Sequence, residues 1–233
     1  MLPGTFSRTR GTGLPSHPPP SGGGVMTLSL DLHLPTWHST GAGGTQFSAD
    51  RSYRYRLHRR WDDGPSLMII ELRPSGANEH HDDDASRRAA AFARGFGYGG
   101  YTSLCLYAAV AADDAHLLTS TSDPVGPDND WWIERAAYCH DVIVFAWGGD
   151  AAAARANAVA SRIWQICQET SAAVAVVGWT AEGQPCGLPD RHRAGLACPH
   201  TVLSTVTAHA HTDFGDVDPR WSALLADTHH LVA

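Results

Sequence analysis

The sequence predicts an α/β protein, a three-layer sandwich in which helices flank a mostly parallel central sheet of about four to five strands. Two observations predict this fold. From residue 65 onward, four short and continuous apolar runs alternate with helix-like segments. Strands that are buried on both faces of a parallel sheet have such runs, and right-handed strand-helix-strand crossovers join them. Hydrophobic residues make up 43% of the 233 residues, which is enough for a sizeable core.

The segment before the first apolar run has two parts. Residues 1–24 are rich in Pro, Gly and Ser and are predicted to be disordered, and Met26 is an alternative to Met1 as the start. Between Phe47 and Trp61 the residues alternate, so that Tyr53, Tyr55 and Leu57 face one way while Arg54, Arg56 and His58 face the other. A period of two with one charged side predicts an edge strand with a basic face.

The four apolar runs are the predicted buried strands, and the segments between them are the predicted helices. The strands are Leu67–Leu72, Tyr101–Val110, Val142–Trp147 and Ala173–Trp179. The helices are Ala85–Arg94, Asp128–Cys139 and Asp150–Thr170. In the last helix Asp150 is the expected N-cap, and Val159, Ile163, Ile166 and Cys167 form one apolar stripe.

These elements define an α/β domain over residues 47–190. Residues 191–233 form a C-terminal extension of uncertain structure, in which Thr201–Ala208 alternates like a short strand.

Composition excludes several classes of function. All 17 basic residues are Arg, so a Lys Schiff base and a Lys-containing phosphate loop are excluded. The net charge of -7 opposes non-specific binding to a polyanion. Apolar runs are too short to span a bilayer. Five Cys without a C-x-x-C pair, and no secretory segment near Met1, predict a reducing, cytoplasmic setting in which Cys105, Cys139 and Cys167 are small buried side chains.

Several short motifs have a functional and a structural interpretation. Gly95, Gly97 and Gly100 match a dinucleotide-binding pattern but follow a helix, which favours a helix end and a turn. The run His80 to Asp84 favours a solvated first helical turn over a metal site. The other weak metal candidates are His209, His211 and Asp213, and Cys186, Cys198 and His200. We therefore predict no metal and no cofactor.

One dense basic cluster lies beside aromatic residues near Tyr53 and Trp61. Arg with aromatic residues is typical of contacts to phosphates and bases, and it is equally typical of a solvated strand face that blocks edge pairing. The cluster consists of Arg51, Arg54, Arg56, Arg59 and Arg60.

A series of sequence blocks in a fixed order resembles a known bacterial family. The blocks are Ser52–Leu57, Trp61–Pro65, Ile70–Ser75, Asp82–Asp83, Arg87–Arg88, Phe92–Gly100, Asp123–Asp130 and Ala146–Gly148. Together they are similar to domain of unknown function 1643, over about residues 47–190. This family implies no activity.

A weaker, fold-level resemblance is to the uracil-DNA glycosylase superfamily. It rests on a strand that ends in Leu-x-Pro-Ser, a Trp-Gly after the third strand and a Pro-containing loop after the fourth. This chain departs from the pattern of domain of unknown function 1643, with Arg73 in place of Asn, Cys105-Leu106-Tyr107 in place of Asn-Leu-Phe, and Cys186–Pro189 in place of a His-Pro-Leu-Tyr block. Three polar positions that would orient a base or a water molecule are thus altered.

The resemblance implies a nucleic-acid- or nucleoside-processing domain, a glycosylase-like hydrolase acting on N-glycosidic bonds, with nucleic acid or a nucleotide-like ligand as partner. The alternative is a catalytically decayed ligand-binding or interaction module of the same fold. The expected catalytic residues are Asp83, Asn129 and Asp130, and the expected substrate-binding residues are Arg73, Ser75 and Arg87. The oligomeric state stays open.

Overall fold

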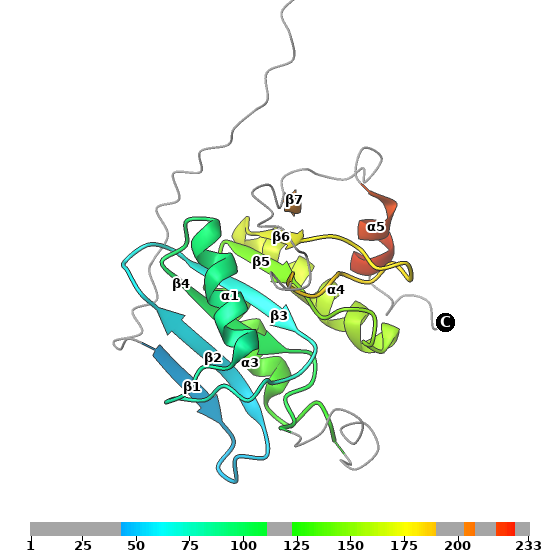
Figure 1. Cartoon of the computed structure of the whole chain (residues 1–233). Helices are drawn as coiled ribbons and strands as arrows, with labels where there is room; N and C mark the ends of the chain where they lie inside the picture. The colour runs from blue at the N-terminus through cyan, green and yellow to red at the C-terminus, as the bar shows by residue number, and fades with distance from the viewer. Residues whose placement is uncertain (1–42, 111–122, 190–202, 208–217, 227–233) are drawn as a thin grey trace, which may run out of the picture. The chain divides into compact units, whose positions relative to one another are not determined.

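The computed structural model describes residues 43–110, 123–189, 203–207 and 218–226. Within them a seven-stranded sheet has the order β1-β2-β4-β3-β5-β6-β7 (Figure 1). Its strands are β1 (Gly43–Phe47), β2 (Arg54–Arg60), β3 (Ser66–Glu71), β4 (Gly100–Cys105), β5 (Val142–Phe145), β6 (Ala173–Val176) and β7 (Ser204–Thr207). The helices are α1 (Asp84–Gly95), α3 (Asn129–Ala137), α4 (Ala153–Thr170) and α5 (Pro219–Leu225).

The α/β class is confirmed, and the four apolar runs form the adjacent parallel strands β4, β3, β5 and β6. The prediction of a mostly parallel sheet of four to five strands is wrong, because the sheet is mixed. β2 pairs antiparallel with β4, β7 pairs antiparallel with β6, and β1 pairs antiparallel with β2. An apolar run indicates a strand that is buried on both faces. The flanking strands are more polar, so apolar runs do not indicate them.

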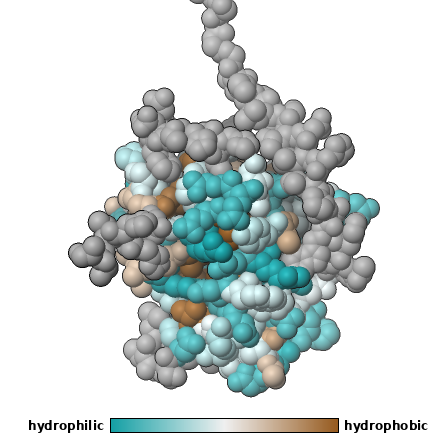
Figure 2. Space-filling view, turned by 180° about the vertical axis from the view of Figure 1, so that it is seen from behind, coloured by the Kyte–Doolittle hydropathy of each residue, from teal (hydrophilic) through white to brown (hydrophobic). Residues whose placement is uncertain are grey.

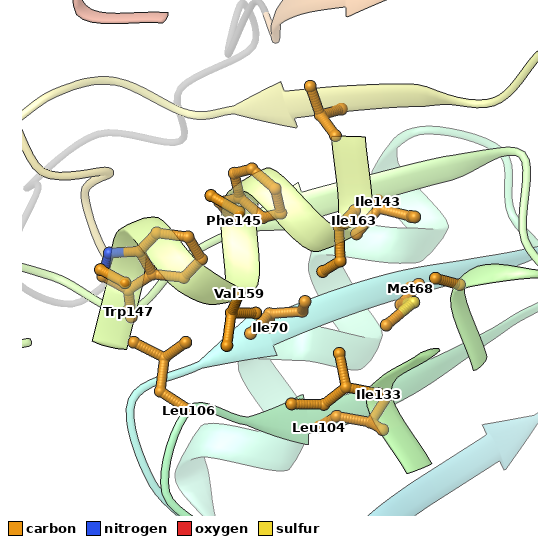
Figure 3. Packing of buried hydrophobic residues seen from close by; sticks show 14 of the residues in the cluster. Met68, Ile70, Leu104, Leu106, Ile133, Ile143, Phe145, Trp147, Val159 and Ile163 are labelled. Atoms are coloured by element: carbon orange, nitrogen blue, oxygen red, sulfur yellow. The ribbon is translucent and has the colours of Figure 1, made fainter. Parts of the chain in front are cut away.

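Helices cover both faces of the sheet, as predicted. On one face α1 packs its Ala89, Phe92 and Ala93 against Leu67 and Ile69 of β3. On the other face α3, α4 and α5 enclose a larger apolar cluster, in which Ile133, Val159 and Ile163 meet side chains of the sheet (Figure 3). The predicted stripe of α4 is confirmed, because Val159, Ile163, Ile166 and Cys167 are all buried.

β2 differs from its prediction in two ways. It is an interior strand between β1 and β4 rather than an edge strand. Its alternation is also broken, because the register with β1 shifts between Gln46 and Phe47. Tyr55 stacks on Trp132 of α3, and Arg56 lies over the same ring, so two consecutive side chains share the α3 face. This β-bulge turns Arg54 to the α1 face, and the expected single basic face does not exist.

The helix ends give one further difference from the predictions and one confirmation. The N-cap of α4 is Ala152, without a side-chain hydrogen bond, so Asp150 is not the cap. α1 ends in a turn in which Gly97 has φ 81° and the Tyr98 N–H donates to the Ala93 carbonyl. The structural interpretation of the glycine motif is thereby confirmed.

Two C-terminal segments join the core of the domain. In α5 Trp221, Leu224 and Leu225 are buried, and the Ser161 hydroxyl of α4 donates to the Ala226 carbonyl. The alternating run is strand β7, whose Val206 is buried.

The expectation for the cysteines holds for Cys105 and Cys167, which are buried, and is wrong for Cys139, which is exposed. The face seen in Figure 2 is largely hydrophilic, with scattered hydrophobic residues. Among the described residues no helix has both the length and the apolar content of a membrane span.

Candidate functional site

The topology singles out the carboxyl end of β3. From β3 the chain crosses to β4 on one side, and it later crosses to β5 on the other side. Loops that leave β3 and β5 therefore diverge, and open α/β sheets bind ligands in the crevice at such a switch point. Polar side chains at this end of β3 are the first place to look for a site.

Glu71, the last residue of β3, is the centre of a group of polar side chains. Its Oε2 accepts a 2.6 Å hydrogen bond from the hydroxyl of Ser103 on β4. Glu71 keeps partial exposure, yet it is enclosed by enough protein to raise the pKa of its carboxyl group, against the opposing effects of the Ser103 hydrogen bond and the charge of Arg54. A carboxyl group in this setting favours its protonated form.

Arg54 reaches the same place because the β-bulge turns it toward α1. It is 2% exposed, and its Nη1 donates to the carbonyl oxygens of Ser75 at 2.9 Å and Ala77 at 2.7 Å. It also acts on the thiol of Cys105, the register partner of Glu71 in β4. Burial raises the pKa of Cys105 to about 12, so this thiol is not a nucleophile. Arg54 therefore fixes the loop after β3.

Asp83 is the second carboxylate of the group. It is the N-cap of α1, and its Oδ1 accepts a 2.9 Å hydrogen bond from the Ser86 N–H. Partial burial would raise its pKa, but hydrogen bonds from Ser86 and Ser75 and the charge of Arg54 outweigh burial and lower the pKa of Asp83. We call Arg54, Glu71, Ser75, Asp83, Ser103 and Cys105 the Glu71 cluster.

The two carboxyl groups of the Glu71 cluster have pKa values moved in opposite directions. The pKa of Glu71 is raised chiefly by burial, and the pKa of Asp83 is lowered by its hydrogen bonds. Carboxyl groups that are separated in this way provide an acid and a base at one pH. The shifts favour the protonated form of Glu71 and the charged form of Asp83 relative to free carboxyl groups.

The predicted site residues fall in three places. Ser75 and Asp83 lie together in the Glu71 cluster. Arg73 is in the loop after β3, two residues beyond Glu71. Arg87 is exposed on α1, where it pairs with Asp84 and donates to the Asp82 carbonyl.

Asn129 and Asp130 lie at the end of β4 instead. Asn129 is fully buried, and its Nδ2 donates to the carbonyls of Cys105 at 3.0 Å and Leu106 at 3.2 Å. Asp130 pairs with Arg155 of α4, whose Nε donates to the same Leu106 carbonyl. Both residues attach helices to the strand end. Asn129 contacts the Glu71 cluster through the Cys105 carbonyl, whereas Asp130 is joined to Arg155.

The turn before Asn129 requires glycine at position 126. Gly126 has φ 90°, and a Cβ atom there would lie 2.6 Å from the ring of Tyr53. The glycine between the two prolines is therefore required by the close approach of the ring.

Sequence reasoning missed Glu71, Arg54, Ser103 and the charge of Arg88 on α1, which also acts on Glu71. One signal was available for Glu71, since it is the only charged residue at the end of an otherwise apolar strand run. The sequence marked Arg54 only as one member of the dense basic cluster, and its place beside Ser75 could not be predicted because it depends on the β-bulge.

A second group of buried polar side chains lies on the α3 face. The Thr102 hydroxyl is 2.9 Å from His58 Nδ1 and 3.1 Å from His140 Nε2, while His140 Nδ1 is 2.7 Å from the Ala136 carbonyl. His140 must donate to that carbonyl, so a neutral His140 accepts from Thr102, and Thr102 accepts from His58. His58 Nε2 is then a buried acceptor without a partner. Burial lowers the pKa of each histidine to about 4.

The remaining motifs do not add a metal site. A surface pocket of about 320 Å³ lies beside the His80 to Asp84 run, but its charges are engaged in the Arg59–Asp82 and Arg51–Glu79 ion pairs. Within the described ranges no three His, Cys, Asp or Glu side chains are placed to hold a metal ion. Residues 1–24, His209, His211, Asp213, Cys198 and His200 lie outside the described residues.

Comparisons with known proteins give one match. Searches of the curated proteins and of the solved structures found no match. The family described as "Protein of unknown function (DUF1643)" matches residues 54–186, a range that contains β2 to β6 and the whole Glu71 cluster. This range is more than half of the chain. The chain therefore belongs to the DUF1643 family.

Proposed function

We propose that the protein is a hydrolase that cleaves the N-glycosidic bond of a nucleoside-containing ligand at the carboxyl end of β3. One observation carries the proposal. Glu71 and Asp83, which share the Glu71 cluster, have pKa values moved in opposite directions. Hydrolysis of a glycosidic bond commonly uses two carboxyl groups, of which one is protonated and one is charged.

The two carboxyl groups have distinct roles in this reaction. Glu71 donates a proton to the departing base nitrogen as the bond from that nitrogen to the sugar carbon breaks. Asp83 stabilises the positive charge that develops on the sugar and accepts a proton from the water that attacks the same carbon. The products are the free base and the sugar with a new hydroxyl group. The proton gained by Asp83 balances the one lost by Glu71, and solvent exchange restores both groups.

Three polar neighbours keep these groups in place. Ser103 holds Glu71 by the 2.6 Å hydrogen bond, and Arg54 holds the loop that carries Ser75. Ser75 in turn hydrogen-bonds to Asp83. Because Arg54 is buried and its Nη1 donates to two carbonyl groups, it acts as a positioning residue rather than as a contact to substrate.

The test is release of a base. The purified protein is incubated with nucleosides, nucleotides and modified single- and double-stranded oligonucleotides, and released bases are detected by mass. Glu71→Gln keeps the size of the side chain and its acceptor for Ser103, but has no acidic proton, so the rate should fall by a factor of about 100 or more. Asp83→Asn keeps an N-cap residue and removes the charge, and should cause a comparable loss.

Glu79→Gln is the matched control. Glu79 is an exposed carboxylate in the same loop, and it pairs with Arg51 rather than with the Glu71 cluster. This variant should keep the full rate. If wild-type protein releases no base from any substrate, or if Glu71→Gln releases it as fast as wild type, the hydrolase proposal is wrong.

The second candidate function is binding without turnover. It is favoured by the structural use of Asn129, Asp130 and Arg87, each of which is engaged in contacts within the protein. In that case a nucleotide-like ligand should bind wild type and Glu71→Gln protein equally, and it should be recovered unchanged. Recovery of free base from wild type alone would exclude this candidate.

A further inference from the structure

The cluster of charges around Glu71 has a positive member that the proposed reaction does not use. Arg88 on α1 acts electrostatically on Glu71 and on Asp84. It is partly buried, and in the described part of the chain no hydrogen bond or ion pair joins it to another residue. Asp84, the nearest carboxylate in sequence, is paired with Arg87 instead.

The periodicity of α1 shows which way Arg88 faces. Ser86, Ala89 and Ala93 face the sheet. Arg87 and Arg94 are seven residues apart, almost two full turns, so they lie on the same flank of the helix. Arg94 lies 4.1 Å over the ring of Trp61, which directly follows β2, so this flank faces β2.

Arg88 lies on the opposite flank of α1. It precedes Phe92 by four residues and follows Ala85 by three, which places the three residues in one row. Because the other flank faces β2, this row faces the side of β3 on which β5 lies. Arg88 is therefore on the side of α1 where the loops after β3 and β5 diverge.

The contacts of the neighbouring carboxyl groups leave the guanidinium group of Arg88 available to an anion. The carboxyl groups nearest to Arg88 are held by other side chains or backbone groups: Asp84 by Arg87, Asp83 by Ser75 and Ser86, and Glu71 by Ser103. In the described part of the chain Arg88 forms no ion pair with these carboxyl groups, and its side chain keeps partial exposure. A guanidinium group presents a planar fork of donors that fits the oxygen atoms of a phosphate group.

We propose that Arg88 binds a phosphate group of the ligand, so that the substrate class is nucleotides rather than free nucleosides. This inference rests on the proposed function, because it takes the nucleoside part of the ligand from there. The phosphate group belongs to a free nucleoside monophosphate or to a nucleic-acid strand. In both cases it lies on the β5 side of α1 while the glycosidic bond lies at Glu71.

The experiment measures binding by calorimetry on the Glu71→Gln protein, so that no turnover is needed. The probes are the four common ribonucleosides, their 5′-monophosphates, inorganic phosphate and a short single-stranded oligonucleotide. At least one phosphate-bearing probe should bind more tightly than its nucleoside by a factor of about ten or more. Arg88→Gln should remove that preference, and Arg88→Lys should keep part of it.

The matched control is Arg94→Gln, which removes the same charge from the same helix, on the flank that faces β2. It should keep the preference for phosphate. Melting curves of each variant check that the fold is intact. If Arg88→Gln is folded and keeps the preference for phosphate, the inference is overturned. It is also overturned if Arg87→Gln abolishes the preference, because Arg87 is then the phosphate ligand.

The outcomes separate this inference from the proposed function. Phosphate binding that depends on Arg88, without release of base by wild type, leaves the phosphate site in place and removes the hydrolase. Release of base at a rate and KM that Arg88→Gln does not change leaves the hydrolase in place and removes the phosphate site. Dependence on Arg88 for the oligonucleotide alone identifies a strand as the source of the phosphate group.

Discussion

Acid should destabilise this protein well above the pH at which carboxylates are protonated, because two histidines are buried in their neutral forms. His58 and His140 have pKa values of about 4 in the folded protein, whereas an unfolded chain has its histidines near 6.5. Between these two values the unfolded state binds protons that the folded state does not. The free energy of unfolding therefore falls as the pH falls from about 6.5 to about 4, and the loss is complete below that.

The magnitude follows from the shifts. Each pKa unit corresponds to about 1.4 kcal/mol, so each histidine costs up to about 3 kcal/mol at low pH, and about 2 kcal/mol at pH 5. The pair then costs about 4 kcal/mol at pH 5, against a usual total stability of ~5 to 15 kcal/mol. The raised pKa of Glu71 acts in the opposite direction, since the folded state gains a proton there first. A comparison of variants is needed to isolate the histidines.

The assay is urea unfolding at several pH values between 8 and 4.5, for wild type and for the double variant His58→Asn/His140→Asn. Asn retains a donor near Nδ1 for Thr102 and for the Ala136 carbonyl, but it does not titrate. The double variant should be less stable at pH 8 and should lose about 4 kcal/mol less than wild type on going to pH 5. His80→Asn, at an exposed histidine, should follow wild type. Equal pH dependence of wild type and the double variant would refute the reasoning.

Three further predictions concern stability and can be checked by the same unfolding assay. Trp221→Ala should cost about 3 to 5 kcal/mol, because the ring is fully buried against α4 and β5, and an unchanged midpoint would mean that α5 does not dock. Ile70→Asp should prevent folding, since the side chain is fully buried in β3, the middle strand of the sheet, and a cooperatively folding variant would contradict this. Asn129→Ala should cost about 1 to 3 kcal/mol, because the protein loses two buried hydrogen bonds. Asp130→Ala should cost about 1 kcal/mol or less, because it removes an ion pair whose carboxylate is exposed. A larger cost for Asp130→Ala than for Asn129→Ala would be inconsistent with these contacts.

The parallel core could be predicted from the sequence because a strand that is buried on both faces consists almost entirely of apolar residues. Leu67 to Ile70 can only be apolar in such a strand, and the stripe of α4 is equally direct. The β-bulge leaves no such trace. It depends on how many residues of β1 stand opposite Tyr55 and Arg56, a property of two strands at once.

The candidate site was predicted in part for the same reason. Asp83 and Ser75 lie in a loop that begins at a recognisable strand end, so their neighbourhood follows from topology. Asn129 donates hydrogen bonds to two backbone carbonyl groups, and because every residue has such a group, the sequence does not show which ones Asn129 contacts. A buried Asn and a ligand-binding Asn look identical in a sequence, and the neighbours Arg87 and Arg88 are the same residue type although they lie on different flanks of α1.

The two outermost strands of the sheet have a practical consequence for any shortened form of the protein. β1 and β7 both lie outside the range of the family match, yet they cover the free edges of β2 and β6. A fragment limited to residues 54–186 would present two rows of unpaired backbone groups, together with the apolar surface that α5 occupies. Such edges recruit other strands, so we expect the fragment to aggregate where the chain from Gly43 to Ala226 stays in solution. Experiments on shortened forms of this protein should accordingly retain the segments on both sides of the matching region.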